Sequence, residues 1–378
     1  MKKNTKHSFL VIVVLLCVCF IVYFLFPRPT CSLSSLDKRA VWFSYSDLAK
    51  FSYESRDAFI EDFSEALRVV DNYKNNTIIV QVRPFADALY QSKIYPISKV
   101  ICHRSSLSFD PLEEMIKLAH KKGISIEAWI NPYRISLNKN TYQNFMELSS
   151  KKSWLEDTKQ SIGYATYKYI INPESQDVRD YIIAGVKEIV ENYEVDGIHF
   201  DDYFYIEGTH GETTQGQRMD NVNMLIQDVY QSIKSINSNI VFGISPQGNY
   251  ENCVNEGADV DTWLKEDGYV DYIMPQVYWS DQYGPDGKTR MFTDRIELYA
   301  GLKRQKTVML YAGLALYQSG EELDLDKGWT LSSSNISEQV QILSNNGYKG
   351  YSLFNYSSLL KEDGEKEMRE LLRTHPYN

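Results

Sequence analysis

The feature that most constrains the fold of this chain is an alternation that repeats from Arg39 to the C-terminus. Each repeat opens with a short apolar, β-branched or aromatic run, passes through a polar and aromatic loop, and ends in a stretch with helical spacing. This order favours parallel strands joined by crossover helices. The runs expected to be strands are Ala40–Ser44, Thr77–Val82, Ile124–Ile130, Gly197–Phe200, Ile240–Ser245, Tyr272–Gln276, Val308–Ala312 and Gly350–Leu353.

The stretches between and after these runs supply the expected helices. They are Arg56–Tyr73, Pro111–Lys122, Ser175–Tyr193, Met219–Ile236, Val260–Glu266, Phe292–Leu302, Ile336–Asn345 and Glu365–Arg373. About eight strands and eight helices are what a closed (β/α)8 TIM barrel requires. An open doubly wound sheet is the alternative, but no Gly-rich phosphate loop follows the first strand. No linker or repeat divides residues 39–378, so we predict a single α/β domain there.

The N-terminal segment has a different character. Lys2, Lys3 and Lys6 precede an uncharged apolar run over residues 8–26, which is about long enough to cross a bilayer as one helix. Positive charge before such a run keeps the N-terminus inside and exports the rest. We expect residues 1–30 to be a signal anchor or a signal peptide, and residues 31–38 a short linker. The lack of an A-x-A-like cleavage site favours the anchor. The domain over residues 39–378 is then extracytoplasmic, either membrane-anchored or secreted.

Net charge and cysteine content limit which binding partners and cofactors the chain can have. The net charge of −10 argues against nucleic acid, because binding phosphates needs a basic face. The 5 cysteines show no zinc signature and no disulfide framework, although one disulfide remains compatible with them. His199 with Asp201 and Asp202 could hold a divalent metal, but no second His or carboxylate cluster completes a coordination shell. We predict neither a metal nor another cofactor.

Strand alternation predicts which side chains face the barrel interior. Alternate residues point inward or toward the helices, and the helix-facing set should be apolar. This criterion places polar and aromatic side chains inside on four strands: Gln81 and Arg83; Glu127, Trp129 and Asn131; His199 and Asp201; Gln276 and Tyr278. A barrel that needed only stability would carry branched aliphatic residues there. The pattern therefore predicts a polar site at the C-terminal strand ends.

The segment from Asp196 to Tyr203 is the strongest local signal for catalysis. Asp201 has inward parity at a strand end, where a carboxylate can be a nucleophile or a general acid/base. Asp202 should point aside, where it could orient a neighbour or cap the turn. Glu127 faces inward on the adjacent strand and is expected in range of Asp201, where a like charge could raise one pKa. The alternative for Glu127 is an ion pair with Arg83 or Arg134.

Other polar and aromatic residues predict a sugar-binding groove. Asn131 and Arg134 follow the third strand and could donate hydrogen bonds to hydroxyls or an acidic sugar, while Tyr133 could stack on a ring. Similar clusters end the sixth and eighth strands. The predicted substrate-binding set is Asp47, Arg83, Asp87, Trp129, Asn131, Tyr133, Arg134, His199, Gln276, Tyr278, Trp279, Asn355 and Tyr356. Asp47 and Asp87 are also further candidates for the second carboxylate that glycoside cleavage commonly uses.

Ordered motifs along the chain resemble the glycosyl-hydrolase-like family 10 of bacteria. They are Arg39-Ala-Val-Trp-Phe43, Thr77-Ile-Ile-Val-Gln-Val-Arg-Pro84 with Asp87-Ala-Leu-Tyr90, Ala128-Trp-Ile-Asn-Pro-Tyr-Arg134, Tyr169-Ile-Ile-Asn-Pro173, Asp196-Gly-Ile-His-Phe-Asp-Asp-Tyr203, Gly243-Ile-Ser-Pro246 and Asp271-Tyr-Ile-Met-Pro-Gln-Val-Tyr278. The resemblance implies a β/α barrel acting on cell-envelope glycans, such as peptidoglycan strands stripped of stem peptides, with Asp201 and Asp202 central. The spacing of Gly197, His199 and Asp201 is also similar to the fourth strand of α-amylase and α-galactosidase barrels, where the Asp is the nucleophile. Glu127 departs from the family pattern, in which a His is expected.

The leading hypothesis is therefore an extracytoplasmic glycoside hydrolase with a cell-envelope glycan as substrate. An α-glycosidase for another polysaccharide is a second enzyme hypothesis. A non-catalytic glycan-binding barrel is the third. Inward polar residues around Asp201 favour an enzyme over the binding protein.

Overall fold

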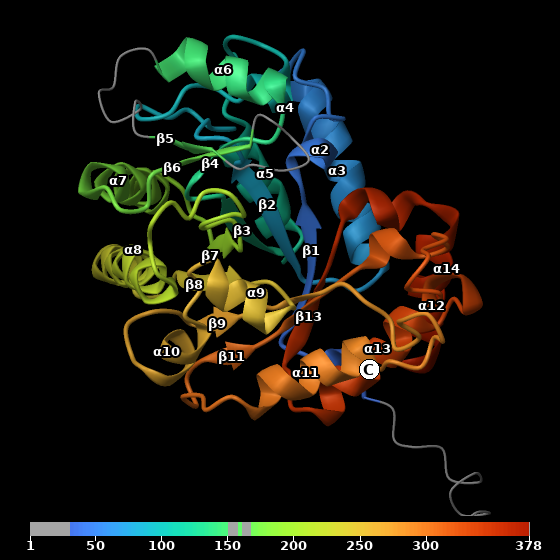
Figure 1. Ribbon diagram of the computed structural model, residues 1–378. Helices are drawn as coiled ribbons and strands as arrows, with labels where there is room; N and C mark the ends of the chain where they lie inside the picture. The colour runs from blue at the N-terminus through green and yellow to red at the C-terminus, as the bar shows by residue number, and fades with distance from the viewer. Residues whose placement is uncertain (1–30, 150–157, 161–167, 378) are drawn as a thin grey trace, which may run out of the picture.

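The computed structural model describes residues 31–149, 158–160 and 168–377, so the predicted anchor or signal segment 1–30 lies outside the described part. Within these ranges, no helix combines the length and apolar character needed to cross a membrane. The main element is a 10-stranded parallel sheet that curls around a central axis, with helices on its outside (Figure 1). In sheet order its strands are β10 (Gln276–Val277), β12 (Ala312–Leu314), β13 (Gly350–Leu353), β1 (Lys38–Phe43), β2 (Thr77–Arg83), β3 (Ser125–Ile130), β7 (Gly197–Asp201), β8 (Val241–Ser245), β9 (Tyr272–Ile273) and β11 (Met309–Leu310).

The strands at the two ends of the sheet come from the same two segments of the chain, one containing β9 and β10 and the other β11 and β12. β9 and β10 are separated only by Met274 and Pro275, and β11 and β12 only by Tyr311. Hydrogen bonds bridge the interruptions: Tyr311 N–H donates to the carbonyl of Ile273 at 2.9 Å, and Gly313 N–H to that of Pro275 at 2.8 Å. The sheet is therefore TIM-barrel-like, and every predicted strand coincides with one or two observed ones.

The outer helices also fall where the sequence predicts them. The helices that match the predicted ones are α3 (Arg56–Asn72), α5 (Pro111–Lys121), α7 (Gln176–Asn192), α8 (Gln215–Ile236), α10 (Val260–Lys265), α11 (Met291–Gly301), α13 (Asn335–Asn345) and α14 (Glu362–Thr374). Ser55 caps α3, while Asp110 caps α5 with Pro111 in its first turn. α8 begins before the predicted Met219, because Thr214 and Gln217 form a capping box.

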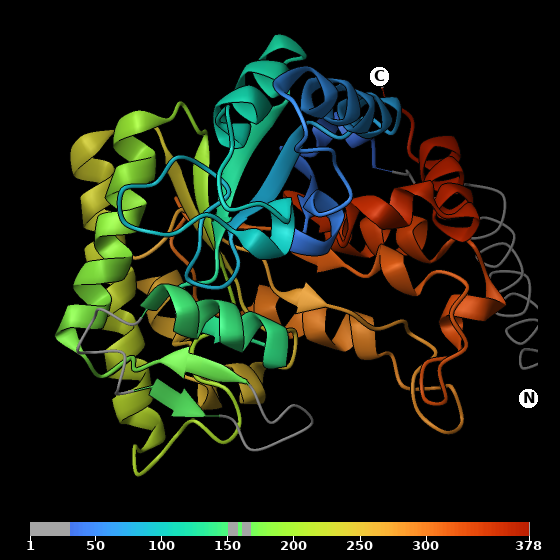
Figure 2. The same ribbon diagram turned by 90° about the horizontal axis from the view of Figure 1, so that it is seen from above.

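The connections add shorter elements. The additional helices are α2 (Tyr45–Leu48), α4 (Lys99–Cys102), α6 (Lys139–Ser149), α9 (Tyr250–Asn255), α12 (Gly328–Leu331) and the 3-10 turns Leu33–Ser35, Leu316–Gln318 and Tyr356–Leu360. An antiparallel sheet that the sequence analysis did not predict lies between β3 and α7. It has the order β4 (Arg134–Ser136), β6 (Tyr169–Ile171), β5 (Thr158–Gln160). Figure 2 shows this sheet and α6 together on one side of the barrel.

The buried apolar residues form two clusters that match the predicted strand alternation. The larger cluster lies between sheet and helices and includes the predicted helix-facing Ile126, Ile198 and Phe200. The smaller one lies inside the barrel and consists of Ala40, Trp42, Ile79, Trp129, Tyr272, Met274 and Tyr311. The barrel interior is thus filled by aromatic rings rather than by layers of branched aliphatic residues. These rings form the support on which the candidate site rests.

Candidate active site

A cavity of 340 Å³ opens at the C-terminal ends of the strands. Clefts of this fold are built at that end from the loops that follow the strands. The residues that line it are Trp42, Ser44, Tyr45, Ser46, Gln81, Trp129, Arg134, Asp201, Asp202, Tyr203, Ser245, Gln276, Tyr278 and Phe354. Six of the predicted site residues are among them: Asp201, Asp202, Trp129, Arg134, Gln276 and Tyr278.

Asp201 ends β7 and is held by several donors. The Asn131 side-chain amide and the Trp129 indole N–H, the latter at 3.3 Å, both donate to Oδ2 of Asp201. The backbone N–H of Tyr203 donates to Oδ1 at 3.1 Å. Asn131 is fixed in turn, because its Oδ1 accepts a 2.6 Å hydrogen bond from Gln81. Donors alone surround the carboxylate in these contacts, so they favour its ionised form.

Asp202 has a poorer set of partners. The Gln276 side-chain amide donates to Oδ1 of Asp202 at 3.1 Å and to the carbonyl of Ser245 at 2.9 Å. Burial, followed by the neighbouring Asp201 charge, raises the pKa of Asp202 to about 7. Burial also raises the pKa of Asp201, but the Arg134 charge and the hydrogen bonds from Tyr203, Asn131 and Trp129 oppose this rise. The three donors to Asp201 favour the negative charge on that group, so the geometry favours the proton on Asp202.

Arg134 supplies positive charge beside the two carboxyl groups. Its guanidinium lies between two rings, 4.8 Å from the centroid of Phe85 and 5.2 Å from that of Tyr203. Its Nε donates to the carbonyl of Pro84 at 2.8 Å. Arg134 begins β4, so the small antiparallel sheet delivers this cation to the barrel cleft.

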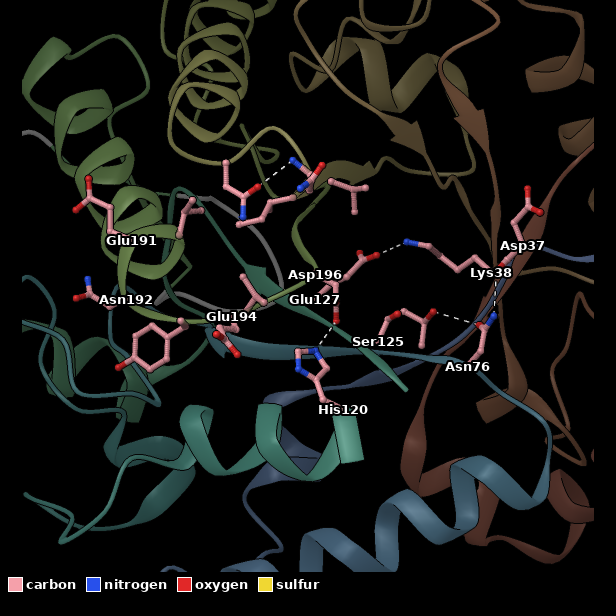
Figure 3. Close-up of a pocket in the computed structure, with 18 residues that line it drawn as sticks. Asp37, Lys38, Asn76, His120, Ser125, Glu127, Glu191, Asn192, Glu194 and Asp196 are labelled. Carbon is pink, nitrogen blue, oxygen red and sulfur yellow. Dashed lines mark hydrogen bonds and ion pairs between the residues drawn. The ribbon is translucent and has the colours of Figure 1, made fainter. Parts of the chain in front are cut away.

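The expectation that Glu127 lies in range of Asp201 is wrong. Strand pairing places Glu127 opposite Gly197, at the beginning of β7, whereas Asp201 is its last residue. A strand rises about 3.3 Å per residue, so the two groups lie at opposite ends of the barrel. Glu127 pairs there with Lys38 rather than with the predicted Arg83 or Arg134. Figure 3 shows this pair at a groove on the N-terminal side.

Two other predicted residues of the early strands lie away from the cleft. Arg83 follows a register shift in β2, and its guanidinium packs over the ring of Tyr95 at 4.5 Å. It donates to the carbonyl of Pro132 at 3.0 Å and is not among the residues lining the cleft. Asp87 is buried and accepts from Phe85 N–H at 3.0 Å, and this burial raises its pKa. Both side chains stabilise the loop after β2.

The structure assigns packing or capping contacts to most of the remaining predicted residues. Tyr133 is fully buried in the outer core, and Tyr356 stacks on Phe43 with ring centroids 4.5 Å apart. Asp47 forms the capping box of α2 and accepts a 2.8 Å hydrogen bond from Asn355. The predicted stacking and substrate contacts of these four residues are therefore not supported by their positions.

His199 and Trp279 also lie outside the cleft lining. His199 has no exposed surface and sits inside the barrel below Asp201. Trp279 follows Tyr278 but is not among the lining residues.

Sequence reasoning missed several cleft residues, above all Trp42, Tyr45, Ser245 and Phe354. The signal for Trp42 was present in the alternation of the first strand. Val41 and Phe43 belong to the outer core, so Trp42 between them had to face inward. Tyr45 and Phe354 come from turns, where alternation gives no direction.

Comparisons with known proteins identify the family of this chain. The family profile described as Glycosyl hydrolase-like 10 matches residues 37–217 and 212–331. The chain belongs to this family. It is 28% identical over 331 residues to the glycosyl hydrolase YngK of Bacillus subtilis, a match that covers 77% of this chain and 63% of the relative. It is 30% identical over 294 residues to the glycosyl hydrolase DigH of Escherichia coli K12, covering 68% and 65% respectively. The chain thus spans less than two thirds of the length of these relatives.

Solved structures support the same barrel architecture. The glycoside hydrolase domain of PgaB (BpsB) from Bordetella bronchiseptica superposes with a TM-score of 0.59 at 11% identity, covering 88% of this chain and 98% of that domain. The catalytic domain of a β-amylase from Paenibacillus polymyxa gives a TM-score of 0.57 at 11% identity, covering 91% and 100%. At these identities the likeness concerns the fold alone.

Proposed function

We propose that this family member is an extracytoplasmic glycoside hydrolase that cleaves glycosidic bonds of cell-envelope glycan. The observation that carries the proposal is the pair Asp201 and Asp202 in one cleft, with environments that separate their ionisation. Two carboxyl groups with different protonation states are what acid-assisted glycoside cleavage uses. The family of the chain and the names of its relatives support the same class of reaction.

The contacts of each carboxyl group suggest its role. Asp201, surrounded by donors and near Arg134, is the anionic group that attacks the sugar or activates water. Asp202, whose pKa lies near 7, donates the proton to the leaving oxygen. The anionic group and the proton donor are then neighbours in the sequence, at positions 201 and 202.

The lining of the cleft favours a sugar substrate. Trp42, Tyr45, Tyr278 and Phe354 present aromatic rings around the carboxyl pair. Such rings offer apolar faces that pack on the C–H face of a sugar, while their polar neighbours bind hydroxyl groups. These rings support binding along the cleft, whichever glycan is bound.

We further propose peptidoglycan strands without stem peptides as the substrate class. Removing a stem peptide leaves a free carboxylate on the sugar, and Arg134 places a cation at the cleft. Segment 1–30 would hold the enzyme at the outer face of the membrane, as its sequence predicts. As part of this proposal, the protein consists of a (β/α)8 barrel that follows an N-terminal anchor.

The test is cleavage of purified glycan strands that lack stem peptides, beside intact peptidoglycan and α-glucans, with products followed by mass spectrometry. We expect shortened strands from the wild-type protein and none from Asp201→Asn. Asp202→Asn should lose activity on natural strands but keep it on an aryl glycoside, whose leaving group needs no proton. Asp220→Asn, an exposed residue of α8, is the matched control.

Three outcomes would change the proposal. Cleavage that survives Asp201→Asn would remove Asp201 from the chemistry. Cleavage of α-glucans alone would favour the α-glycosidase. Binding of glycan without cleavage by the wild-type protein would favour the non-catalytic barrel.

A further inference from the structure

A continuous line of buried polar groups runs through the barrel from the N-terminal groove to the cleft. It begins at the ion pair of Lys38 and Glu127, which Figure 3 shows at the edge of the groove. The Tyr272 hydroxyl contacts Glu127 Oε2 at 2.5 Å and His199 Nδ1 at 2.7 Å. On the other side of its ring, His199 Nε2 contacts Ser245 Oγ at 3.0 Å. Glu127 and Tyr272 are 2% exposed and His199 is 0% exposed, so water does not compete for these contacts.

Two glycines make room for this line inside the barrel. A Cβ atom at Gly197 would lie 2.8 Å from Cγ of Glu127, and one at Gly243 would lie 1.9 Å from the Tyr272 ring. Both distances are too short for a real Cβ contact. The line therefore depends on the absence of side chains at these positions on β7 and β8.

The chemistry of the groups fixes the direction of the hydrogen bonds that join Glu127, Tyr272 and His199. Glu127, paired with the Lys38 ammonium, accepts and does not donate. Tyr272 therefore gives its one hydroxyl hydrogen to Glu127, and its oxygen accepts from Nδ1–H of His199. Burial, followed by the Lys38 charge, lowers the pKa of His199 well below its ordinary value, so the ring is neutral and carries one hydrogen. Nε2 is then an acceptor.

The cleft side of the ring leads to the same assignment independently. The indole N–H of Trp42 points to His199 Nε2 at 3.3 Å, and an indole N–H can only donate. This contact favours an unprotonated Nε2, in agreement with the Glu127 side. Trp42 and Ser245 both line the cleft, and the Ser245 carbonyl anchors Gln276, which contacts Asp202.

We propose that Glu127 is a positioning residue for the cleft: through Tyr272 it keeps the hydrogen of His199 on Nδ1, so that the one lone pair of Nε2 faces the Trp42 indole N–H and Ser245 Oγ. The effect on catalysis rests on the proposed function, whereas the hydrogen position does not. Glu127 thus acts at a distance from the reacting groups, in contrast to the catalytic role that the sequence suggested.

The variant Glu127→Gln should reverse the direction of the hydrogen bonds between residue 127, Tyr272 and His199. The amide oxygen turns toward the Lys38 ammonium, so the amide NH2 faces the Tyr272 oxygen. Tyr272 then donates to Nδ1 of His199, and the ring hydrogen moves to Nε2, opposite the Trp42 N–H. Nitrogen-15 NMR of histidine-labelled protein reads the hydrogen position directly. We expect Nδ1–H in the wild type, Nε2–H in Glu127→Gln, and a shifted Trp42 indole signal, assigned by its loss in Trp42→Phe.

The activity should follow the hydrogen position. We expect kcat/KM of Glu127→Gln on glycan strands to fall about tenfold, the usual effect of one misplaced buried hydrogen bond. Tyr272→Phe keeps the ring but removes the acceptor of Nδ1–H, so the population of the Nε2–H form should rise above that of the wild type. This variant tests the proposal if Glu127→Gln does not fold. The matched control is Glu114→Gln on α5, a buried glutamate paired with Arg56 at 2.8 Å, which should change neither readout.

Unchanged hydrogen positions in both Glu127→Gln and Tyr272→Phe would overturn the proposal. A fall in activity with the hydrogen still on Nδ1 would also overturn it, since Glu127 would then act only on stability. If the wild-type protein cleaves no glycan, the NMR measurements still decide the question, so the failure of the proposed function is seen separately.

Discussion

Replacing Asp202 by Asn should make the protein more stable at alkaline pH. The folded state raises the pKa of Asp202 from its ordinary value of 3.8 to about 7. Between these values the folded chain binds a proton that the unfolded chain has lost, so stability falls as pH rises through this window. The contribution is fully present below the lower value and is lost above the higher one. Asn has no proton to lose, and its Oδ1 keeps the acceptor that Gln276 uses.

The size of the effect follows from the same two values. At 1.36 kcal/mol per pH unit, the interval from 3.8 to about 7 corresponds to about 4 kcal/mol. The part of this interval between pH 5 and pH 7 can be measured conveniently, and it corresponds to about 3 kcal/mol. The Asp202 side chain is partly exposed, and solvent screening reduces this to about half. We therefore expect the advantage of Asp202→Asn over wild type to grow by roughly 1 to 2 kcal/mol between pH 5 and pH 8.

Urea denaturation at the two pH values measures this difference. With a slope of about 3 kcal/mol per molar, the midpoint difference should grow by about 0.5 M. Asp220→Asn, which removes one exposed charge on α8, should show the same difference at both pH values. An Asp202→Asn advantage that stays constant or shrinks with pH would refute the reasoning, because ionised Asp202 would then not be destabilising.

Three further results are expected. Activity should fall as pH rises through about 7, since Asp202 then loses the proton that it donates, and a pH–rate profile without this limb would argue against Asp202 as the acid. Trp129→Phe removes one of the donors to Asp201 and should lower kcat by about tenfold, measured by product formation; thermal unfolding should show a loss of about 1 kcal/mol, because the ring belongs to the inner cluster. Tyr356→Ala should instead lose about 3 kcal/mol of stability, because the ring stacks on Phe43 in the core, and activity per folded molecule should remain. A selective loss of substrate affinity in Tyr356→Ala would place it in the cleft after all.

The alternation of apolar and polar residues predicted the fold well because each barrel strand has two different surroundings. Ile198 and Phe200 face helices, while His199 and Asp201 do not, and one residue of error would have exchanged all four. The same rule located Gln276 and Tyr278 correctly in the cleft. Alternation therefore carries real information about which face a side chain occupies.

Alternation could not predict how far along the barrel axis a side chain lies. Glu127 and Asp201 both face inward, but the strand register that separates them is set by pairing between distant segments. Arg83 failed for a related reason, since the register shift in β2 ends the simple alternation. The residues after strands, such as Tyr133 and Asn355, follow loop geometry that single sequences do not encode in a short pattern.

The origin of Arg134 has a consequence for how such proteins diversify. Asp201 belongs to the barrel itself, whereas Arg134 belongs to the antiparallel sheet inserted after β3. Insertions and deletions in that sheet would alter the charge and shape beside the sugar without moving the reacting carboxylate. On the proposed function, substrate preference and reaction chemistry are carried by separate pieces of the chain, so that evolution can exchange one while it preserves the other.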